Sequence, residues 1–262
     1  MLRFKNLGSG STGNASVIEA QCGIQTTRIL IDCGLGLKEL ERRLIQANLE
    51  LSDLDALFIT HEHADHVGHT KRVASSLKIP VWMSQGTWLA CGGLDWGFNP
   101  SQINIAKDTE VIEFGALQIK PFTVPHDARE PLQVRLSDGA VSLGVLTDLG
   151  HVSPHVFSQL QGCNAMLMET NHDTQMLRKS GYPQFLKDRI SGPLGHLSND
   201  SACELAQKLN HSGLGHVVAA HLSERNNSPE IVLDCLSRAL GRTVDEVWVA
   251  APDTGSAWVH VN

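Results

Sequence analysis

The sequence predicts an α/β fold in which two β-sheets pack between layers of helices. Short aliphatic runs bounded by Gly, Pro, Asn or Asp recur along the chain and indicate strands. Amphipathic patterns lie between several of these runs and indicate helices. The 262 residues can bury one large core, and no linker, charge run or internal repeat interrupts them. We therefore expect residues 1–262 to form a single domain.

The expected strands are the β-branched or aliphatic runs of the chain. They cover Ser16–Ile18, Arg28–Ile31, Ala56–Ile59, Leu117–Val124, Val134–Leu136, Val141–Leu146, Ala165–Met168, Val217–Ala220 and Val247–Ala250. A first strand is also expected before the Gly-rich segment Gly8–Asn14. That segment lacks the Lys of a P-loop, so it is either a tight turn that supports a site or a direct contact to substrate.

The first helix is predicted from Leu37, Leu40 and Leu44, which recur at spacings of three and four residues. Glu39 and Arg43 stand four residues apart and are expected to pair on the opposite face. The pattern of an amphipathic helix therefore covers this stretch.

Two later helices are predicted by their start signals. Ser201 and Glu204 have the spacing of a capping box, ahead of a second amphipathic pattern. That pattern consists of Ala202, Leu205, Ala206 and Leu209. Ser228 followed by Pro229 opens another helix, with Pro at its first position.

Composition limits the classes of function and the location. The formal net charge is −7, so any contact with a polyanion must be local. The six cysteines show no pair at metal or redox spacing, and we expect them to be reduced and mostly buried. The N-terminus lacks a signal-peptide pattern, and no apolar run is long enough to cross a bilayer. These features predict a soluble cytoplasmic protein without a membrane contact, and nothing implies an obligatory protein partner.

Four potential metal ligands crowd the segment that follows the strand Ala56–Ile59. They are His61, His63, Asp65 and His66. Residues one and two apart do not share a helix face, so these side chains can converge only if the chain turns around a point. Burying so many titratable groups without a cation would be costly. A metal is therefore favoured over a solvated turn, and two metals are expected.

Three more candidate ligands occupy the same kind of position as His61. His126, Asp148 and His221 each lie just beyond an apolar strand. Ligands on loops at one edge of a sheet can meet there without disturbing the core. Their separation along the chain is therefore no obstacle to a shared site.

The ordered motifs resemble those of the metallo-β-lactamase fold. They are Thr60-His61-Glu62-His63-Ala64-Asp65-His66, then Val124-Pro125-His126-Asp127, Thr147-Asp148-Leu149-Gly150 and Ala220-His221-Leu222-Ser223. The resemblance implies a four-layered αβ/βα sandwich, with two mixed sheets flanked by helices and a dinuclear site at one edge. By this resemblance His61, His63 and His126 would hold one metal and Asp65, His66 and His221 the other. Asp148 would bridge them, and a bridging hydroxide would be the nucleophile.

The donor set and its charge indicate the cofactor and the substrate class. Imidazole and carboxylate suit zinc, manganese or iron, so two divalent ions of uncertain identity are expected. With a bridging hydroxide the site keeps a net charge of roughly +1, which favours an anionic phosphodiester over a neutral amide. Asp148 also argues against an antibiotic-hydrolysing member, because the best-known zinc β-lactamases resemble this pattern but have Cys there.

A second set of motifs is similar to the nucleases of this superfamily. Glu169-Thr170-Asn171-His172-Asp173 and Gly195-His196-Leu197-Ser198-Asn199, together with Gly8–Asn14, are typical of the small YycJ-like (WalJ-like) branch. That resemblance implies a 5′-to-3′ DNA exonuclease, with DNA as substrate. Asp65, Asp148 and His196 are the expected catalytic residues, and His196 would stabilise or protonate the phosphate group.

Other substrate contacts are expected at Asn171, His172 and Asn199. Asn171 and His172 could equally cap a helix that begins near Asp173. Basic residues near these motifs could contact DNA phosphates or form an ordinary solvated helix face. They are Lys71, Arg72, Arg178, Lys179, Lys187 and Arg189.

Three functional alternatives share the same ligands. A phosphodiesterase for cyclic nucleotides and a glyoxalase-type thioesterase would use every proposed metal ligand. A catalytically silent scaffold is disfavoured, because all seven ligand positions are filled.

Overall fold

Two mixed sheets form the centre of the molecule, as the sequence predicts. The computed structural model describes residues 1–262. In one sheet the strand order is β14 (Val259–Val261), β1 (Leu2–Gly8), β2 (Ala15–Cys22), β3 (Gln25–Ile31), β4 (Ala56–Phe58), β5 (Val81–Met83) and β6 (Ile103–Ile105). In the other it is β13 (Trp248–Val249), β12 (His216–Ala220), β11 (Ala165–Glu169), β10 (Ser142–Leu146), β9 (Leu132–Ser137), β8 (Leu117–Thr123) and β7 (Ile112–Phe114).

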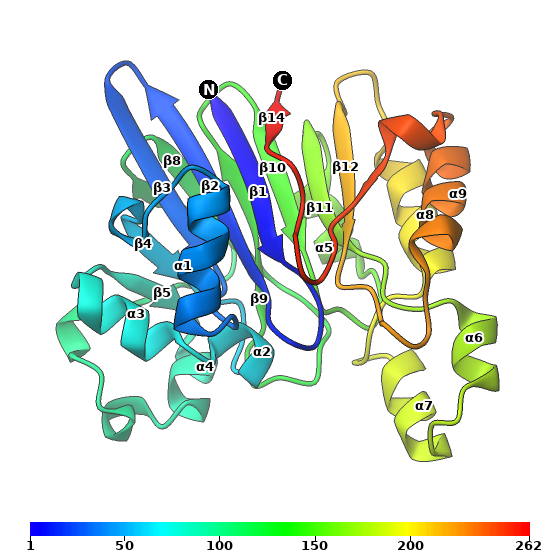
Figure 1. Ribbon diagram of the computed structural model, residues 1–262, viewed down its shortest axis with the longest axis horizontal. Helices are drawn as coiled ribbons and strands as arrows, with labels where there is room; N and C mark the ends of the chain where they lie inside the picture. The colour runs from blue at the N-terminus through cyan, green and yellow to red at the C-terminus, as the bar shows by residue number, and fades with distance from the viewer.

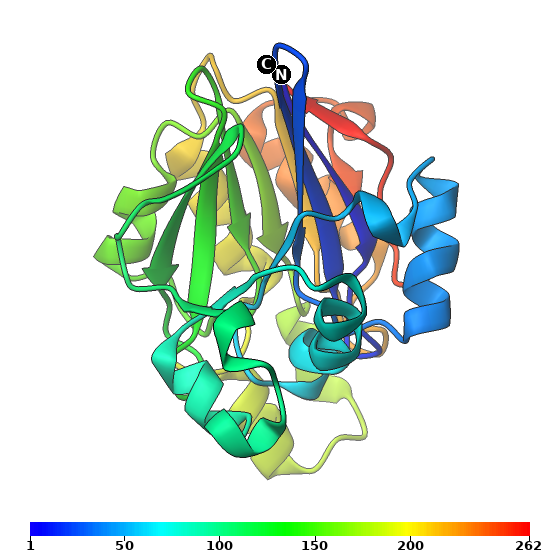
Figure 2. The same ribbon diagram turned by 90° about the vertical axis from the view of Figure 1, so that its left-hand side faces the viewer.

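Each sheet combines an antiparallel part with a parallel part. In the first sheet β14, β1, β2 and β3 pair antiparallel, whereas β3, β4, β5 and β6 pair parallel. In the second sheet β7 to β10 pair antiparallel and β10 to β13 pair parallel. Figure 2 shows β1, β2 and β3 of the first sheet in blue beside β8, β9 and β10 of the second sheet in green.

Helices cover the outer face of each sheet (Figure 1). Those packed with the first sheet are α1 (Leu37–Gln46), α3 (Thr70–Leu77) and α4 (Gln85–Ala90). Those packed with the second sheet are α5 (Pro154–Leu160), α8 (Asn199–Leu209) and α9 (Pro229–Leu240). The remaining helices are α2 (Ala64–Val67), α6 (Thr174–Lys179) and α7 (Gln184–Ser191). No helix combines the length and apolar character that crossing a membrane requires.

The core consists of three apolar layers, and the alternation of side chains along the strands places them. In β3, Ile29 and Ile31 lie in the layer between the two sheets, whereas Leu30 faces the layer beneath α1. The strands were predicted from their aliphatic runs, and this alternation, which the structure adds, assigns each side chain to one of the two faces. Fully burying each such side chain contributes about 1.5–3 kcal/mol.

Four short strands carried too weak a signal to be predicted. They are β5, β6, β7 and β14. Each has only three residues, and half-buried positions occur in β5, β6 and β7. Runs of this length cannot establish a period, so their pairing is decided by the neighbouring strands.

Two details of the helices differ from prediction. The capping box expected at Ser201 is wrong, because α8 begins at Asn199 and the Ser198 hydroxyl accepts the Ser201 N–H. Arg43 does pair with Glu39 across 2.6 Å, but it is buried rather than on a solvated face. Its guanidinium also donates to the Leu7 carbonyl, so the side chain ties α1 to β1.

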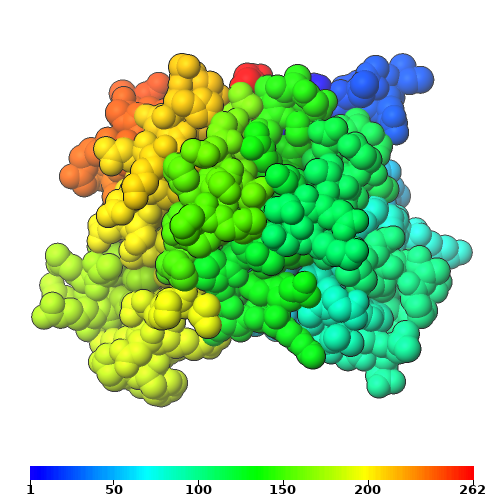
Figure 3. Space-filling view, turned by 180° about the vertical axis from the view of Figure 1, so that it is seen from behind, coloured from blue at the N-terminus to red at the C-terminus, as the bar shows by residue number.

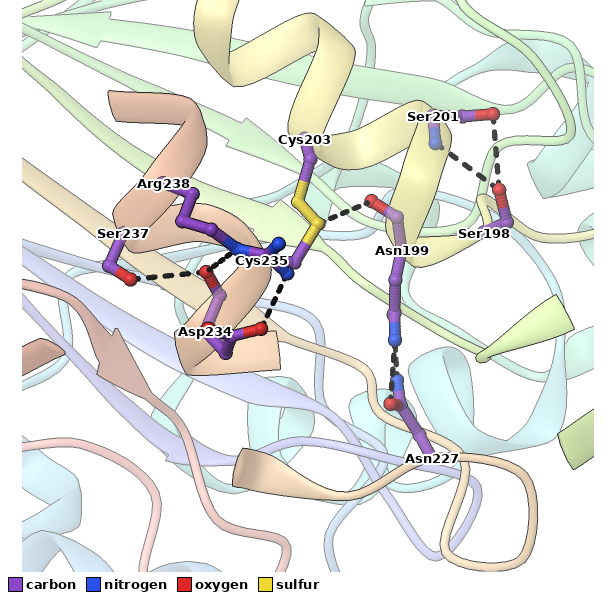
Figure 4. The surroundings of a disulfide bond; sticks show 9 residues. All are labelled: Ser198, Asn199, Ser201, Cys203, Asn227, Asp234, Cys235, Ser237 and Arg238. Carbon is purple, nitrogen blue, oxygen red and sulfur yellow. Dashed lines mark hydrogen bonds and ion pairs between the residues drawn. A yellow bond between two sulfur atoms is a disulfide. The ribbon is translucent and has the colours of Figure 1, made fainter. Parts of the chain in front are cut away.

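The cysteine prediction is also corrected. Cys203 of α8 and Cys235 of α9 form a disulfide, shown in Figure 4, so they are not both reduced. Of the four free cysteines, Cys33 and Cys163 are buried, as expected, and Cys22 is exposed. Spacing along the sequence could not reveal this pair, because packing of two separate helices brings the sulfur atoms together.

Candidate metal centre

The proposed ligands lie beyond the carboxyl ends of strands from both sheets. His61 and His63 follow β4, and the short helix α2 presents Asp65 and His66. His126 follows β8, whereas Asp148 and His221 follow β10 and β12. The helix α2 lies at the lower edge of the sheets in Figure 1. The turn off β4 therefore begins the cluster, as the spacing predicted.

The first group of donors is formed by His61, His63 and His126. One ring nitrogen from each lies within 4.8 Å of the others, and His126 Nε2 is 3.3 Å from His63 Nδ1. His126 Nδ1 lies 3.1 Å from the Gly195 carbonyl and His61 Nδ1 3.0 Å from the Thr60 hydroxyl. These contacts orient the rings and leave each Nε2 free to bind. His61 Nε2 is buried and has no hydrogen-bond partner.

The second group is formed by Asp65, His66 and His221, whose donor atoms also lie within 4.8 Å of one another. His66 Nδ1 is held 2.7 Å from the buried carboxylate of Asp32, which leaves Nε2 toward the group. The Asn14 amide donates to Asp65 Oδ2 across 3.2 Å. His221 Nε2 is buried without a hydrogen-bond partner. Both orphaned nitrogens suit the donor role that a cation requires.

Asp148 lies between the two groups. Its Oδ2 is 2.9 Å from His66 Nε2, and its Oδ1 is 3.3 Å from His221 Nδ1. It also lies within 4.8 Å of the donor atoms of His61 and His66. The position fits a carboxylate that contacts both groups at once.

Backbone strain occurs at three residues of this cluster. Asp32, Asp148 and His221 have φ values of +61°, +53° and +56°. This left-handed region costs a non-glycine residue about 1–3 kcal/mol and persists only where surrounding structure enforces it. Each residue follows the end of a strand, where Asp148 and His221 join the donor groups and Asp32 holds His66.

Electrostatics favours a cation in this cluster. Burial lowers the pKa of His61 well below its ordinary value, with the neighbouring His66 cation adding to the effect. Burial would raise the pKa of Asp148, but His221 and His66 outweigh it and hold that pKa well below the usual range. A neutral imidazole and an ionised carboxylate are the forms that bind a metal, and His61 and Asp148 already have them. Burial would lower the pKa of His66 and of His221, but the neighbouring carboxylates outweigh it and raise both pKa values, so a bound metal would replace the protons of these two rings. The donor set is the one that zinc, manganese and iron accept.

A second carboxylate supports His196. Glu169 is fully buried, and its Oε1 lies 2.8 Å from His196 Nδ1 and 3.1 Å from His221 Nδ1. Its Oε2 accepts the N–H groups of Leu149 and Leu197. Burial would lower the pKa of His196, but the Glu169 and Asp148 carboxylates outweigh it and raise the pKa to about 11. His196 is therefore held as a cation beside Asp148.

A cleft of about 650 Å³ opens over these residues. Metal-ligand candidates and His196 form its floor, and Gly10 and Ser11 of the Gly-rich segment line one side. Both interpretations of that segment therefore have support, since Asn14 also holds Asp65. The rim contains Tyr182, Arg189 and Arg225.

Only one of the three expected substrate-contact residues lines the cleft. Asn171 lines the cleft, and its amide donates to the His221 carbonyl. His172 is buried behind the cleft, where its carbonyl accepts the Asn199 N–H. The Asn199 amide pairs with Asn227, as Figure 4 shows, and does not line the cleft. Asp173 caps α6, so neither Asn171 nor His172 has that role.

The basic residues lie in three different places: the cleft, a separate cavity and the helix surfaces. Arg189 lines the cleft and pairs with Asp127 across 2.7 Å. Arg178 and Lys187 line a separate cavity of about 220 Å³ beside His172. Lys71, Arg72 and Lys179 are exposed on helix surfaces.

Sequence reasoning missed three residues of the site and its cleft, Asp32, Tyr182 and Arg225, and gave no role to Glu169. Asp32 directly follows the apolar run Ile29–Ile31. This position at the end of a strand is the signal that identified His61, and it could have identified Asp32. Glu169 was recognised as part of a motif, but its contacts to His196 and His221 were not foreseen. Tyr182 carried no signal, because a lone aromatic residue is ordinary in a sequence.

Comparisons with known proteins show which proteins this chain is similar to. Residues 27–221 match the family described as beta-lactamase superfamily domain. An exodeoxyribonuclease YycJ of Bacillus anthracis is 34% identical over 91% of this chain and 89% of its own length. An exodeoxyribonuclease WalJ of Streptococcus pneumoniae is 32% identical over 99% of this chain and 98% of its own. The crystal structure of the metallo-β-lactamase fold protein YhfI from Bacillus subtilis superposes with a TM-score of 0.72 at 13% identity, covering 99% of this chain and 100% of that one.

Proposed function

The chain belongs to the beta-lactamase superfamily, and from this membership we propose that it is a dinuclear exodeoxyribonuclease acting in the 5′-to-3′ direction. At the coarser level it is a metal-dependent hydrolase of the metallo-β-lactamase fold. The observation that carries the proposal is the convergence of seven donor side chains at one edge of the sheets, where four of them and His196 line a cleft. Relatives named exodeoxyribonuclease support DNA as the substrate.

The residues divide between two cation positions. His61, His63 and His126 would hold one ion, and Asp65, His66 and His221 would hold the other. The carboxylate of Asp148 would contact both. When bound, two divalent ions lower the pKa of water to give a nucleophile near neutral pH and neutralise charge on the phosphate.

His196 can supply a proton to the departing oxygen. Its ring is cationic because Glu169 and Asp148 stabilise that form, and it lines the cleft beside the donor groups. An imidazolium at this position can stabilise the charge of the pentavalent phosphate or protonate the leaving oxygen. Glu169 fixes the ring through Nδ1 and leaves Nε2 to act.

The charge of the cleft rim suits a nucleic acid strand. Arg189 and Arg225 line the cleft on an otherwise acidic protein of formal charge −7. Local cations of this kind contact backbone phosphates without reading sequence. Binding of DNA is therefore expected to weaken steeply as the salt concentration rises.

The proposal is tested with protein that has been stripped of metal and reloaded with zinc, manganese or iron. We expect stepwise degradation of 5′- and 3′-labelled duplex and single-stranded DNA in at least one metal form. Asp148→Ala should retain the fold and lose hydrolysis by at least about 100-fold, because it removes the carboxylate shared by both donor groups. Elemental analysis of each variant checks its metal content.

Two outcomes would contradict the proposal. Unchanged turnover in Asp148→Ala with its metal retained would exclude the mechanism. Hydrolysis of cyclic nucleotides or thioesters with intact DNA would instead identify one of the other enzyme classes that share these ligands.

A further inference from the structure

An aromatic side chain and a cation face each other at the rim of the cleft. The Arg225 guanidinium lies 5.9 Å from the centre of the Tyr182 ring. Tyr182 belongs to the turn between α6 and α7, and Arg225 belongs to the loop that follows β12 and His221. Both side chains line the cleft that contains Asp65, His196 and His221. The α6–α7 segment projects from one lower corner of the molecule in Figure 3, coloured yellow-green.

Apart from their loose contact with each other, neither side chain has a polar partner within the protein. Tyr182 is the only tyrosine of the chain, it is half-buried, and its hydroxyl makes no hydrogen bond within the protein. Arg225 is exposed and makes no ion pair with any carboxylate. The other arginine–aromatic contact differs, because Arg3 lies 4.2 Å from the Trp258 ring and is paired with Glu19. Arg3 is therefore held by an ion pair, whereas no ion pair holds Arg225 in place beside Tyr182.

The spacing of the pair suits a flat ligand. Stacked bases are separated by about 3.4 Å, so a base between two planes requires about 7 Å. The distance of 5.9 Å from the guanidinium carbon to the ring centre is that of a loose cation–π contact, and it is at least about 1 Å short of what a base between the two planes requires. Arg225 ends a long, flexible side chain whose planar head stacks on aromatic faces, so a small shift of Arg225 completes the gap.

We propose that Tyr182 and Arg225 form a nucleobase subsite, in which the base next to the scissile phosphate stacks between the phenol ring and the guanidinium. This inference rests on the proposed function, which places a phosphodiester over the donor groups. Every base has a π-face, so the subsite accepts all four bases. A base held there cannot stay paired with the complementary strand, so duplex ends must open before cleavage.

Two chromogenic esters with the same leaving group test the subsite. Thymidine 5′-(p-nitrophenyl phosphate) carries a base, whereas methyl p-nitrophenyl phosphate carries none. Tyr182→Leu should lower kcat/KM for the thymidine ester about 5- to 150-fold, the usual range for losing one stacked base. The methyl ester should be hydrolysed unchanged. Equal losses on both esters, or no loss on either, would overturn the subsite.

Three further variants make the result specific. Tyr182→Phe keeps the ring and should retain the preference for the thymidine ester. Arg225→Gln should lower kcat/KM more for the thymidine ester than for the methyl ester, because a phosphate contact is lost on both esters but the second plane matters only where a base is present. Phe185→Leu is the matched control, since Phe185 is an aromatic residue of α7 that is 73% exposed and does not line the cleft. A loss in the control equal to that in Tyr182→Leu would contradict the proposal.

A binding measurement separates failure of the subsite from failure of the proposed function. Metal-loaded protein is titrated into a duplex that carries 2-aminopurine at an unpaired 5′ end and phosphorothioate linkages that resist hydrolysis. Stacking on Tyr182 should quench the fluorescence, and the quenching should be lost in Tyr182→Leu and kept in Tyr182→Phe. If no metal form hydrolyses either ester or DNA, the proposed function fails, and this titration still decides whether the subsite exists. Equal quenching by wild type and Tyr182→Leu would overturn it.

Discussion

Glu169 is the residue that connects the donor groups to His196. One carboxylate oxygen contacts both His196 and His221, and the other accepts two backbone N–H groups. Burial would raise its pKa, but the His196 cation outweighs burial and lowers the pKa to about 2. A carboxylate so strongly held as an anion fixes the position and the charge of its partner.

We predict that Glu169→Gln lowers kcat for DNA hydrolysis about 100- to 10,000-fold, the usual contribution of one positioned acid. The amide can still accept from the backbone, but it no longer stabilises the His196 cation. The KM should change much less than kcat, and elemental analysis should find the metal retained. Glu110→Gln is the control, because Glu110 is an exposed carboxylate paired only with Lys107. An unchanged kcat in Glu169→Gln would exclude this role for Glu169.

At the scale of single elements, β1, β2 and β3 share a buried charge. Glu19 of β2 is 3% exposed and lies 2.7 Å from both Arg3 of β1 and Arg28 of β3. Burial would raise the pKa of Glu19, but hydrogen bonds from the two arginines outweigh it and lower the pKa. The three strands are therefore linked by an ion triad on their outer face.

We predict that this triad makes the free energy of unfolding depend on pH. Because the folded pKa of Glu19 lies below its ordinary value of 4.5, its contribution is complete above that value. It is lost as the pH falls through the folded pKa. Glu19→Gln should cost about 1–3 kcal/mol near neutral pH and less near pH ~3. Urea unfolding at several pH values measures both, and a constant difference at every pH would contradict the assignment.

The disulfide connects two helices behind the site. Cys203 and Cys235 are 32 residues apart, and Cys235 also contacts the Asn199 carbonyl, as Figure 4 shows. Asn199 in turn bonds Asn227, which donates to the Asn171 carbonyl. The bond therefore supports the start of α8 and the segment that lines the cleft.

We predict that reduction of this bond lowers the free energy of unfolding by roughly 3–4 kcal/mol, the chain-entropy value for a loop of this length. The melting temperature should fall when dithiothreitol is added to the wild type. Cys235→Ser should have the lower melting temperature with or without reductant. Cys91→Ser, which removes a partly exposed free thiol, should keep the wild-type response. A wild type that does not respond to reductant would contradict the prediction.

At the scale of the whole molecule, the donor groups join the two sheets. His61 and Asp65 follow a strand of the first sheet, whereas His126, Asp148 and His221 follow strands of the second. A cation bound by both sets would link the sheets at the edge where they meet. Because the folded state alone brings these donors together, metal binding stabilises folding.

We predict that chelation lowers the melting temperature by about 5–10 °C, the shift expected for a ligand present at about 100 times its dissociation constant. Adding zinc or manganese back should restore it. Asp148→Ala should show a smaller difference between the two states. If residues 1–262 form one domain, both forms should unfold in a single transition. If metal removal is verified and the melting temperature does not change, the result would contradict a metal site shared by the two sheets.

Local patterns were enough to predict much of this protein. The aliphatic run of β3 and the spacing of leucines in α1 depend only on neighbouring residues, so both elements were predicted, although β3 begins at Gln25 rather than at Arg28. His61, His63, Asp65 and His66 lie within six consecutive residues, and so short a segment limits how they can be arranged. The strand-end positions of His126, Asp148 and His221 added the rest of the cluster.

Contacts between distant segments could not be read in the same way. Glu169 with His196, Tyr182 with Arg225 and Cys203 with Cys235 meet through the packing of separate elements. A sequence pattern gives the period and the ends of an element, but the distance between two elements follows from how their buried faces fit together. Such pairs emerge only when the chain has folded, and here they support His196, shape the rim of the cleft and join the helices behind it.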